Sequence, residues 1–264
     1  MKTRLTGPEL RKLALRESGS PRRYVALLTR ALRAGDADAL VDFAVLQQEG
    51  YRDQRGRVLV RANPKAAARA FLQAASAGTR SAFHALGYCF DVGLGVRRNT
   101  ERALKWYRCA WRHGGETAAA NIATVYRERG LLRRAVAWWK RAMEAGVHEE
   151  IVELGYCYQY GIGVRRDARN AIACYRLAIR SRNIIESERE AAMYHLAVLY
   201  LDSQPPNRPK AVTLLERASI DRDYPEAMKL LAQLLQRQPL VPCRCRRDRV
   251  KTLPGNARCE LHPV

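Results

Sequence analysis

The sequence has no long apolar run. Across its 264 residues no stretch approaches the 18 or more apolar residues of a membrane-spanning helix, and the first 23 residues lack the apolar core of a secretory signal. Motifs of catalysis are also missing, because none of the five histidines stands in an HExxH pair or in a context that names a nucleophile. We therefore expect a cytoplasmic protein that neither spans a membrane nor acts as an enzyme.

Acidic residues are scarce beside basic ones. The chain has 26 Asp and Glu against 47 Lys and Arg, a net charge of +21, and only eight of the basic residues are Lys. Such a charge attracts acidic protein segments and phosphate backbones. A compositional preference for Arg that only solubilises the surface explains the same excess, so composition alone leaves both interpretations open.

What the sequence does have is a phrase that occurs twice. Leu86-Gly87-Tyr88-Cys89, followed by Gly93-x-Gly95-Val-Arg-Arg, returns 68 residues later as Leu154-Gly155-Tyr156-Cys157, followed by Gly161-x-Gly163-Val-Arg-Arg. This distance is two units of about 34 residues, which is a period typical of helical solenoids. Stacked repeats usually present a surface to partners.

A second pattern has the same period. Five pairs of alanines, seven residues apart and each with a bulky or aromatic residue between, mark one face of an amphipathic helix. They are Ala67/Ala74, Ala103/Ala110, Ala135/Ala142, Ala171/Ala178 and Ala211/Ala218. Each is preceded by a helix that carries a small residue where the two helices must approach closely. These small residues are Ala44, Gly87, Ala123, Gly155 and Ala197.

Together these residues resemble the Sel-one-like repeat, a relative of the tetratricopeptide repeat. The resemblance is close at residues 79–114 and 147–182 and looser at 36–78, 115–146 and 187–222. It implies an all-α fold, a right-handed α-solenoid of antiparallel helix pairs that acts as an interaction scaffold. We expect a degenerate helical repeat at 1–35, the solenoid at 36–238 and a basic, Cys- and Pro-containing tail at 239–264.

Basic residues recur with the repeat. Two Arg pairs follow the Gly-x-Gly-Val turns, and three further basic residues directly precede the first alanine of a pair. The set is Arg97, Arg98, Arg102, Arg134, Arg165, Arg166 and Lys210. Stacking places them along one edge, which predicts a site for an acidic segment of a protein partner. Nucleic acid is a weaker candidate partner, because the aromatic residues lie on core positions of the pattern.

The seven cysteines fall into two groups. Four of them, Cys89, Cys109, Cys157 and Cys174, lie in predicted helices and are interpreted as small buried side chains. The tail holds the other three and a histidine: Cys243, Cys245, Cys259 and His262. Three thiolates and an imidazole suit a structural zinc ion, although the Cys-x-Cys spacing is shorter than usual. A zinc-stabilised tail and an unliganded tail with reduced cysteines both stay open.

Two functions of different class follow. The first is a non-enzymatic scaffold whose inner groove, lined by the first helix of each pair, holds a segment of a partner protein. The alternative is a nucleic-acid-associated or regulatory factor, in which the Arg edge contacts phosphates and the tail binds zinc.

Overall fold

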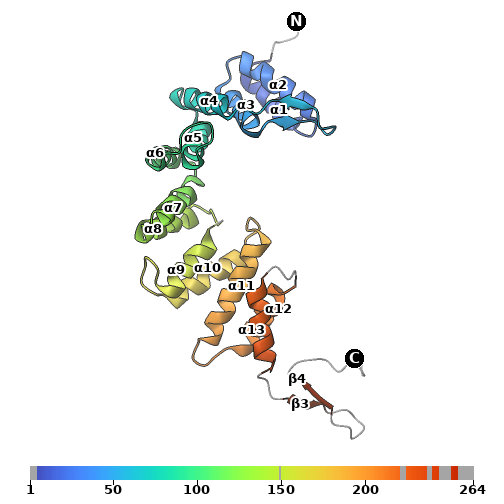
Figure 1. Cartoon of the computed structure of the whole chain (residues 1–264), viewed down its shortest axis with the longest axis vertical. Helices are drawn as coiled ribbons and strands as arrows, with labels where there is room; N and C mark the ends of the chain where they lie inside the picture. Colours follow the sequence, from blue (N-terminus) through green and yellow to red (C-terminus); the bar gives the residue numbers. More distant parts are fainter. Residues whose placement is uncertain (1–4, 149, 221–223, 237–239, 244–250, 255–264) are drawn as a thin grey trace. The chain divides into compact units, whose positions relative to one another are not determined.

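The protein is all-helical apart from two short strand pairs (Figure 1). The computed structural model describes residues 5–148, 150–220, 224–236, 240–243 and 251–254. These residues form thirteen α-helices and four strands, and the chain divides into two compact units, Met1–Val147 and His148–Val264. None of the described helices is long and apolar enough to cross a membrane.

The first unit consists of four helical hairpins. Their helices are α1 (Gly7–Arg16), α2 (Pro21–Arg33), α3 (Ala37–Glu49), α4 (Pro64–Ser76), α5 (Arg80–Val92), α6 (Thr100–Arg112), α7 (Ala118–Glu128) and α8 (Leu132–Glu144). Strands β1 (Tyr51–Arg52) and β2 (Val58–Val60) pair antiparallel between α3 and α4.

The second unit continues the same construction. It contains α9 (Ile151–Tyr160), α10 (Ala168–Arg180), α11 (Glu186–Leu201), α12 (Arg208–Ala218) and α13 (Pro225–Gln236), then the antiparallel pair β3 (Leu240–Cys243) and β4 (Lys251–Pro254). We call the odd-numbered helices the first helices and the even-numbered ones the second helices. Each second helix packs on the first helix before it.

The alanine pairs form the core of the hairpins, as the sequence predicts. All ten alanines are buried, and none is more than 2% exposed. The large residue four positions after each leading alanine is buried as well; these residues are Phe71, Tyr107, Trp139, Tyr175 and Leu215. Of the four helical cysteines, Cys109 is only partly buried, whereas the other three are buried.

Two hairpins place a tyrosine ring directly on a glycine. A Cβ on Gly87 would overlap the Tyr107 ring, and one on Gly155 would lie 2.7 Å from Cε1 of Tyr175. The hydroxyl groups donate to equivalent residues of the first helices, Tyr107 to Asp91 at 3.4 Å and Tyr175 to Gln159 at 2.8 Å. Glycine in the first helix thus makes room for a buried ring whose polar end is satisfied.

The helix ends show a further repeated device. Four second helices begin with an Asn or Asp whose side chain accepts a backbone N–H bond three residues later. These residues are Asn63, Asn99, Asp167 and Asn207, each four positions before the leading alanine. After the second helices, Gly78, Gly114 and Gly146 have φ near +80°. Glycine adopts this conformation at little cost and ends the helix.

The glycine turn inside a hairpin also sets the distance to its neighbour. A Cβ on Gly95, in the α5–α6 turn, would overlap the carbonyl group of Pro64, the first residue of α4. Gly95 has φ of +70°. The turn therefore needs glycine both for its backbone conformation and for its close approach to the preceding hairpin.

Candidate protein-binding surface

The first helices expose aromatic and aliphatic side chains that their hairpins do not use for packing. Tyr88 and Tyr156, one residue after the small glycine of each repeated phrase, are 45% and 38% exposed. Val45 occupies the same position after Ala44 and is also exposed. Tyr160, one turn beyond Tyr156, is 51% exposed. The first helices thus present large side chains to solvent about 100° around the helix from the face that packs on the paired helix.

In the second unit these side chains form a cluster. We call Tyr156, Tyr160, Tyr194, His195 and Tyr224 the tyrosine–histidine cluster. The ring centroids of Tyr156 and Tyr160 lie 4.5 Å apart, those of Tyr156 and His195 5.4 Å, and those of Tyr194 and Tyr224 5.3 Å. The residues come from α9, from α11 and from the position before α13, so two successive first helices and the residue that precedes a third contribute to one surface.

Burial shifts the pKa of three members of this cluster toward their neutral forms. Desolvation lowers the pKa of His195, whose Nδ1 atom is buried and has no hydrogen-bond partner among the described residues. The imidazole stacks on Tyr175 with a centroid separation of 5.6 Å. Desolvation also raises the pKa of the Tyr160 and Tyr224 hydroxyls, which further favours their protonated form. The cluster offers neutral rings and hydroxyl donors, the groups that many protein interfaces use as anchors.

The corresponding face of the first unit is more polar. The Asn121 amide nitrogen and His84 Nε2 lie 2.7 Å apart and link α7 to α5. The imidazole also lies against the ring of Tyr107, with centroids 5.6 Å apart. Two consecutive first helices are therefore joined by a side-chain hydrogen bond on the face that Tyr88 shares.

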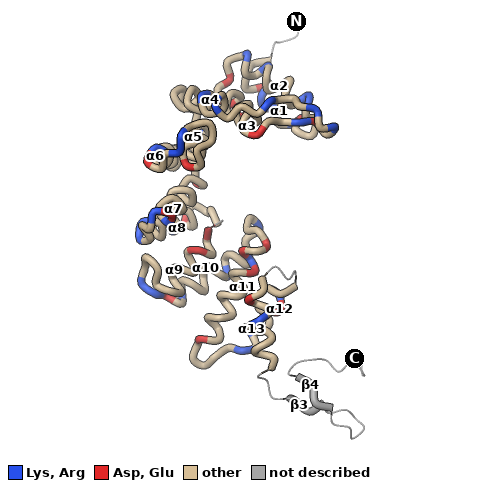
Figure 2. Tube along the Cα trace, in the orientation of Figure 1, with Lys and Arg blue, Asp and Glu red and all other residues tan. Residues whose placement is uncertain are grey.

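The positive charge is concentrated on the second helices. The six second helices carry 20 Arg and Lys against three Asp and Glu, a net +17. The seven first helices carry seven against eleven, a net −4. Figure 2 marks these residues along the chain. A uniform compositional preference for Arg would make both sets of helices basic. The difference between the two sets therefore favours a role for the positive charge on the second helices.

Three residues of the predicted basic edge lie over aromatic rings of their own hairpins. The cationic groups of Arg102, Arg134 and Lys210 lie 5.5, 5.8 and 5.8 Å from the ring centroids of Phe90, Tyr126 and Tyr200. The three rings occupy one repeat position, three residues after the small residue of the first helix. Cation–π attraction thus gives these basic residues a role in the repeat itself.

The rest of the basic edge is less uniform. Arg98 bonds Glu128 at 3.2 Å and the carbonyl oxygen of Asp91 at 2.6 Å. Arg97 and Arg165 are exposed and make no ion pair with other described residues, and Arg166 lies near the Tyr160 hydroxyl. Because the structure accounts for several of the seven residues within the chain, the edge as a partner site remains a prediction.

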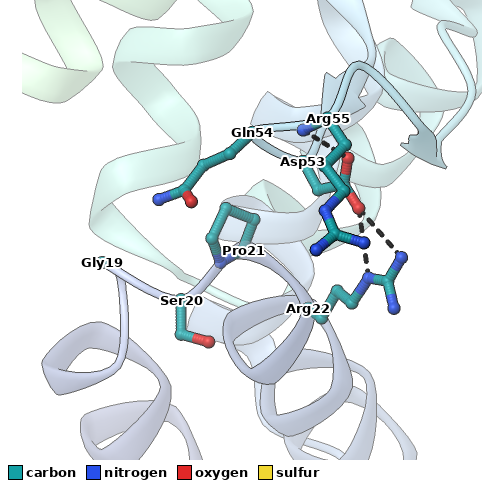
Figure 3. A pocket seen from close by; sticks show the side chains of 7 residues that line it. All are labelled: Gly19, Ser20, Pro21, Arg22, Asp53, Gln54 and Arg55. Carbon is teal, nitrogen blue, oxygen red and sulfur yellow. Dashed lines mark hydrogen bonds and ion pairs between the residues drawn. The ribbon is translucent and has the colours of Figure 1, made fainter.

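The connection between α3 and α4 is seven residues longer than the equivalent connection between α5 and α6, and it folds as a β-hairpin. With the α1–α2 turn it encloses a hollow of about 330 Å³ lined by Gly19, Ser20, Pro21, Arg22, Asp53, Gln54 and Arg55 (Figure 3). Asp53 bonds Arg22 at 3.0 Å and accepts the backbone N–H groups of Arg55 and Arg57. These bonds hold its pKa below the usual value, the Arg57 N–H contributing most. Asp53 is thus committed to the turn.

The predicted zinc ligands lie outside the described side chains. Cys245, Cys259 and His262 fall outside the described residues, and Cys243 is described only as backbone in β3. Within the described residues no group of three or more His, Cys, Asp or Glu side chains could hold a metal ion. The zinc hypothesis stays a prediction for the tail.

Known proteins share this repeat. The family model described as Sel1 repeat matches residues 82–114, 118–147, 151–183 and 190–220. The chain is a Sel1-repeat protein. The four matched repeats are the hairpins from α5/α6 to α11/α12, so the family pattern does not cover the two hairpins before them, α1/α2 and α3/α4. The predicted membership of the Sel-one-like repeat family is confirmed, and so is the predicted all-α solenoid fold.

Solved Sel1-repeat structures have the same fold. A protective antigen of uropathogenic Escherichia coli, c5321, matches with a TM-score of 0.74 at 20% identity, over 88% of this chain and 50% of that one. A Sel1 repeat protein from Oxalobacter formigenes matches with a TM-score of 0.66 at 19% identity, over 85% and 89%.

Curated relatives are longer proteins. The DAP3-binding cell death enhancer 1 of Rattus norvegicus is 32% identical over 105 residues, and its counterpart in Mus musculus is 31% identical. The match spans 39% of this chain but only 19% of either relative. The chain therefore resembles a part of those proteins.

The tyrosine–histidine cluster was not predicted from the sequence. The signal was present, because Tyr88 and Tyr156 follow the glycine that faces the paired helix, and adjacent helix positions point about 100° apart. A tyrosine directly after a buried helix position therefore lies at the edge of the core, where it is partly exposed. The sequence does not show that side chains of α9, of α11 and of the residue before α13 lie close enough to form one cluster.

Proposed function

We propose that this Sel1-repeat protein is a non-enzymatic scaffold whose first-helix face binds an extended or helical segment of a partner protein. The observation that carries the proposal is the tyrosine–histidine cluster. Tyr194, His195 and Tyr224 pack partly on the helices beneath them, whereas Tyr156 and Tyr160 are exposed, although the α9–α10 pair is already closed by its alanines and by the Tyr175 ring on Gly155. Exposed clusters of this kind mark interaction sites in soluble proteins.

The chemistry of the cluster suits a protein segment. Tyrosines provide large contact areas at a small cost in side-chain entropy, and their hydroxyls can pair with peptide carbonyl groups. Desolvation holds His195 neutral, so the surface does not repel the apolar side chains of a ligand. The first helices carry a slight excess of acidic residues, which does not suit a phosphate backbone on this face.

The test is recovery of the partner from the native host. Nuclease-treated extract is passed over wild-type protein and over the double variant Tyr156→Ser/Tyr160→Ser, and bound proteins are quantified by mass spectrometry. We expect the variant to lose its specific partner at least tenfold, since anchors of this type are worth about 2 kcal/mol or more. The variant Leu72→Ala, at an exposed apolar residue of α4, is the control and should retain it.

Recovery that is equal for both proteins contradicts the proposal. A partner recovered from untreated extract but lost from nuclease-treated extract contradicts it too, because that result points to nucleic acid as the bridge.

A further inference from the structure

A second surface, on the side of the second helices, has a different composition. Between α6 and α8 lies a hollow of about 460 Å³, lined by Lys105, Arg108, Trp111, Arg112 and Trp138. We call it the Trp–Arg hollow. Two half-buried indoles form its apolar part, and every other lining residue is cationic. The sequence placed the aromatic residues on core positions, but these two rings reach the surface.

The two indoles are held in a fixed arrangement. Their ring centroids lie 5.9 Å apart with planes at 83°, so the edge of one ring meets the face of the other. Both rings pack on the buried alanines of α7 and α8. The guanidinium of Arg141 lies 4.7 Å from the centroid of Trp138 and covers one of its faces. The rings therefore form a rigid wedge with little flat surface left open.

The cations are spaced along one side of α6. Lys105, Arg108 and Arg112 stand at positions i, i+3 and i+7, which places them in a row about 10 Å long. Arg108 is oriented by a hydrogen bond to the Tyr126 hydroxyl of α7. Lys105 and Arg112 are exposed and have no ion-pair partner among the described residues. The row can thus accept carboxylates without first breaking a salt bridge.

We propose that the Trp–Arg hollow docks an acidic segment of a partner protein, which packs an aliphatic side chain against the exposed edges of the two indoles. Carboxylates three or four positions apart on a helical segment match the spacing of the cations. The wedge suits a leucine or isoleucine side chain, whereas single-stranded nucleic acid needs open ring faces on which successive bases stack. The proposal rests on the scaffold function proposed above and adds a second surface to it.

The test uses a defined probe with the full-length protein. A fluorescein-labelled peptide of about 14 residues, built from Glu, Leu and Ala, carries Glu in rows three or four positions apart beside one leucine stripe. Fluorescence polarisation measures its binding to wild type, to Lys105→Glu/Arg112→Glu and to Arg169→Glu/Arg180→Glu. The last is a matched control, because it makes the same change of net charge on α10, and Arg180 is the repeat equivalent of Arg112.

We expect the hollow variant to bind at least about tenfold more weakly and the control within about twofold of wild type. A peptide with alanine in place of leucine should also lose affinity, and added salt should weaken binding through screening of the charges. Circular dichroism checks that both variants remain helical, which the exposure of the four substituted side chains leads us to expect.

The proposal is overturned if the peptide does not bind, if both variants lose equal affinity, or if binding does not require leucine. Binding of labelled oligothymidine at the hollow in place of the peptide also overturns it and assigns the surface to nucleic acid. If the peptide fails while partner recovery still depends on Tyr156 and Tyr160, the hollow assignment falls and the scaffold function stands. If both fail, both are wrong.

Discussion

At the scale of the residue, the decisive contact is a tyrosine ring lying on a glycine. Gly87 and Gly155 sit under Tyr107 and Tyr175, and the ring in each case is at most 1% exposed. A helix prefers alanine over glycine by up to about 1 kcal/mol, so the glycines lower intrinsic helix stability. The packing of a large aromatic residue more than offsets this cost, because burying such a ring is worth several kcal/mol.

This contact predicts the effect of adding one methyl group. Gly87→Ala gains helix propensity but forces the Tyr107 ring out of a close-packed position, and we expect a net loss of about 1–2 kcal/mol in the free energy of unfolding. Gly87→Leu should cost at least about 2 kcal/mol. Chemical denaturation monitored by circular dichroism measures both.

The chain supplies a control and a rescue for this prediction. A Cβ on Gly19 would meet no atom within 4 Å, so Gly19→Ala should change stability by less than about 0.5 kcal/mol. Tyr107→Leu removes the ring that the new methyl group would strike, so the double variant with Gly87→Ala should be more stable than the two single effects added together. Simple additivity would show that the ring and the glycine do not touch.

The sequence predicted the small residue and the ring but not the partners of the polar atoms. Asp91 and Gln159 accept the two tyrosine hydroxyls, yet both are one turn past the glycine, where the pattern marks no specific role. The cations over Phe90, Tyr126 and Tyr200 were likewise interpreted only as an edge facing a partner. Side-chain pairing within a hairpin depends on rotamers that helical periodicity does not specify.

At the scale of the element, the β-hairpin between α3 and α4 depends on one carboxylate. Asp53 joins Arg22 of α2 to the turn, and Val60 of β2 is buried while Tyr51 lies edge-on to Tyr24. This hairpin was not predicted from the sequence. Strands of two and three residues are too short for a reliable alternating pattern, and their stability comes from these tertiary contacts.

Removing the carboxylate should loosen this hairpin without unfolding the helices. In Asp53→Ala, the backbone N–H groups of Arg55 and Arg57 lose their acceptor, and we expect trypsin to cut after Arg52, Arg55 or Arg57 faster than in wild type. Mass spectrometry of the early fragments measures the change. Gln54→Ala, at the exposed tip, is the control, and equal cleavage of all three proteins would contradict the assigned role.

The same carboxylate sets a pH dependence. Hydrogen bonding lowers the folded-state pKa of Asp53 below the ordinary 3.8, so its contribution to stability is present above that value. It is lost as the pH falls through the lowered pKa. The NMR signals of the Arg55 and Arg57 amides should therefore shift only below about pH 4, and Asp53→Asn should abolish the shift.

At the scale of the whole molecule, the fold could be predicted because its information is local and repeated. The five hairpins from α3/α4 to α11/α12 each contain the same alanine pair and small residue, so five independent copies confirm one another. The candidate sites could not be predicted in the same way. The tyrosine–histidine cluster and the Trp–Arg hollow each combine side chains from neighbouring hairpins, and the separation between such residues varies with turn length.

A repeated architecture also predicts how damage spreads. Because each hairpin contacts mainly its neighbours, stability is close to a sum of local terms. In Gly155→Ala we expect faster amide hydrogen exchange in α9 and α10 and wild-type exchange in α1 and α2, measured by mass spectrometry. A uniform increase along the chain would show instead that the array unfolds as one cooperative body.

The close approach of Gly95 to Pro64 restricts where the chain can grow. The α5–α6 turn packs against the start of α4, so residues inserted in this turn would separate the two hairpins. The connection that does contain extra residues, between α3 and α4, has no Gly-x-Gly phrase and places its added length in a β-hairpin beside α2. Loop grafts and affinity tags should accordingly be tolerated at the tip near Gly56 and rejected at Gly95.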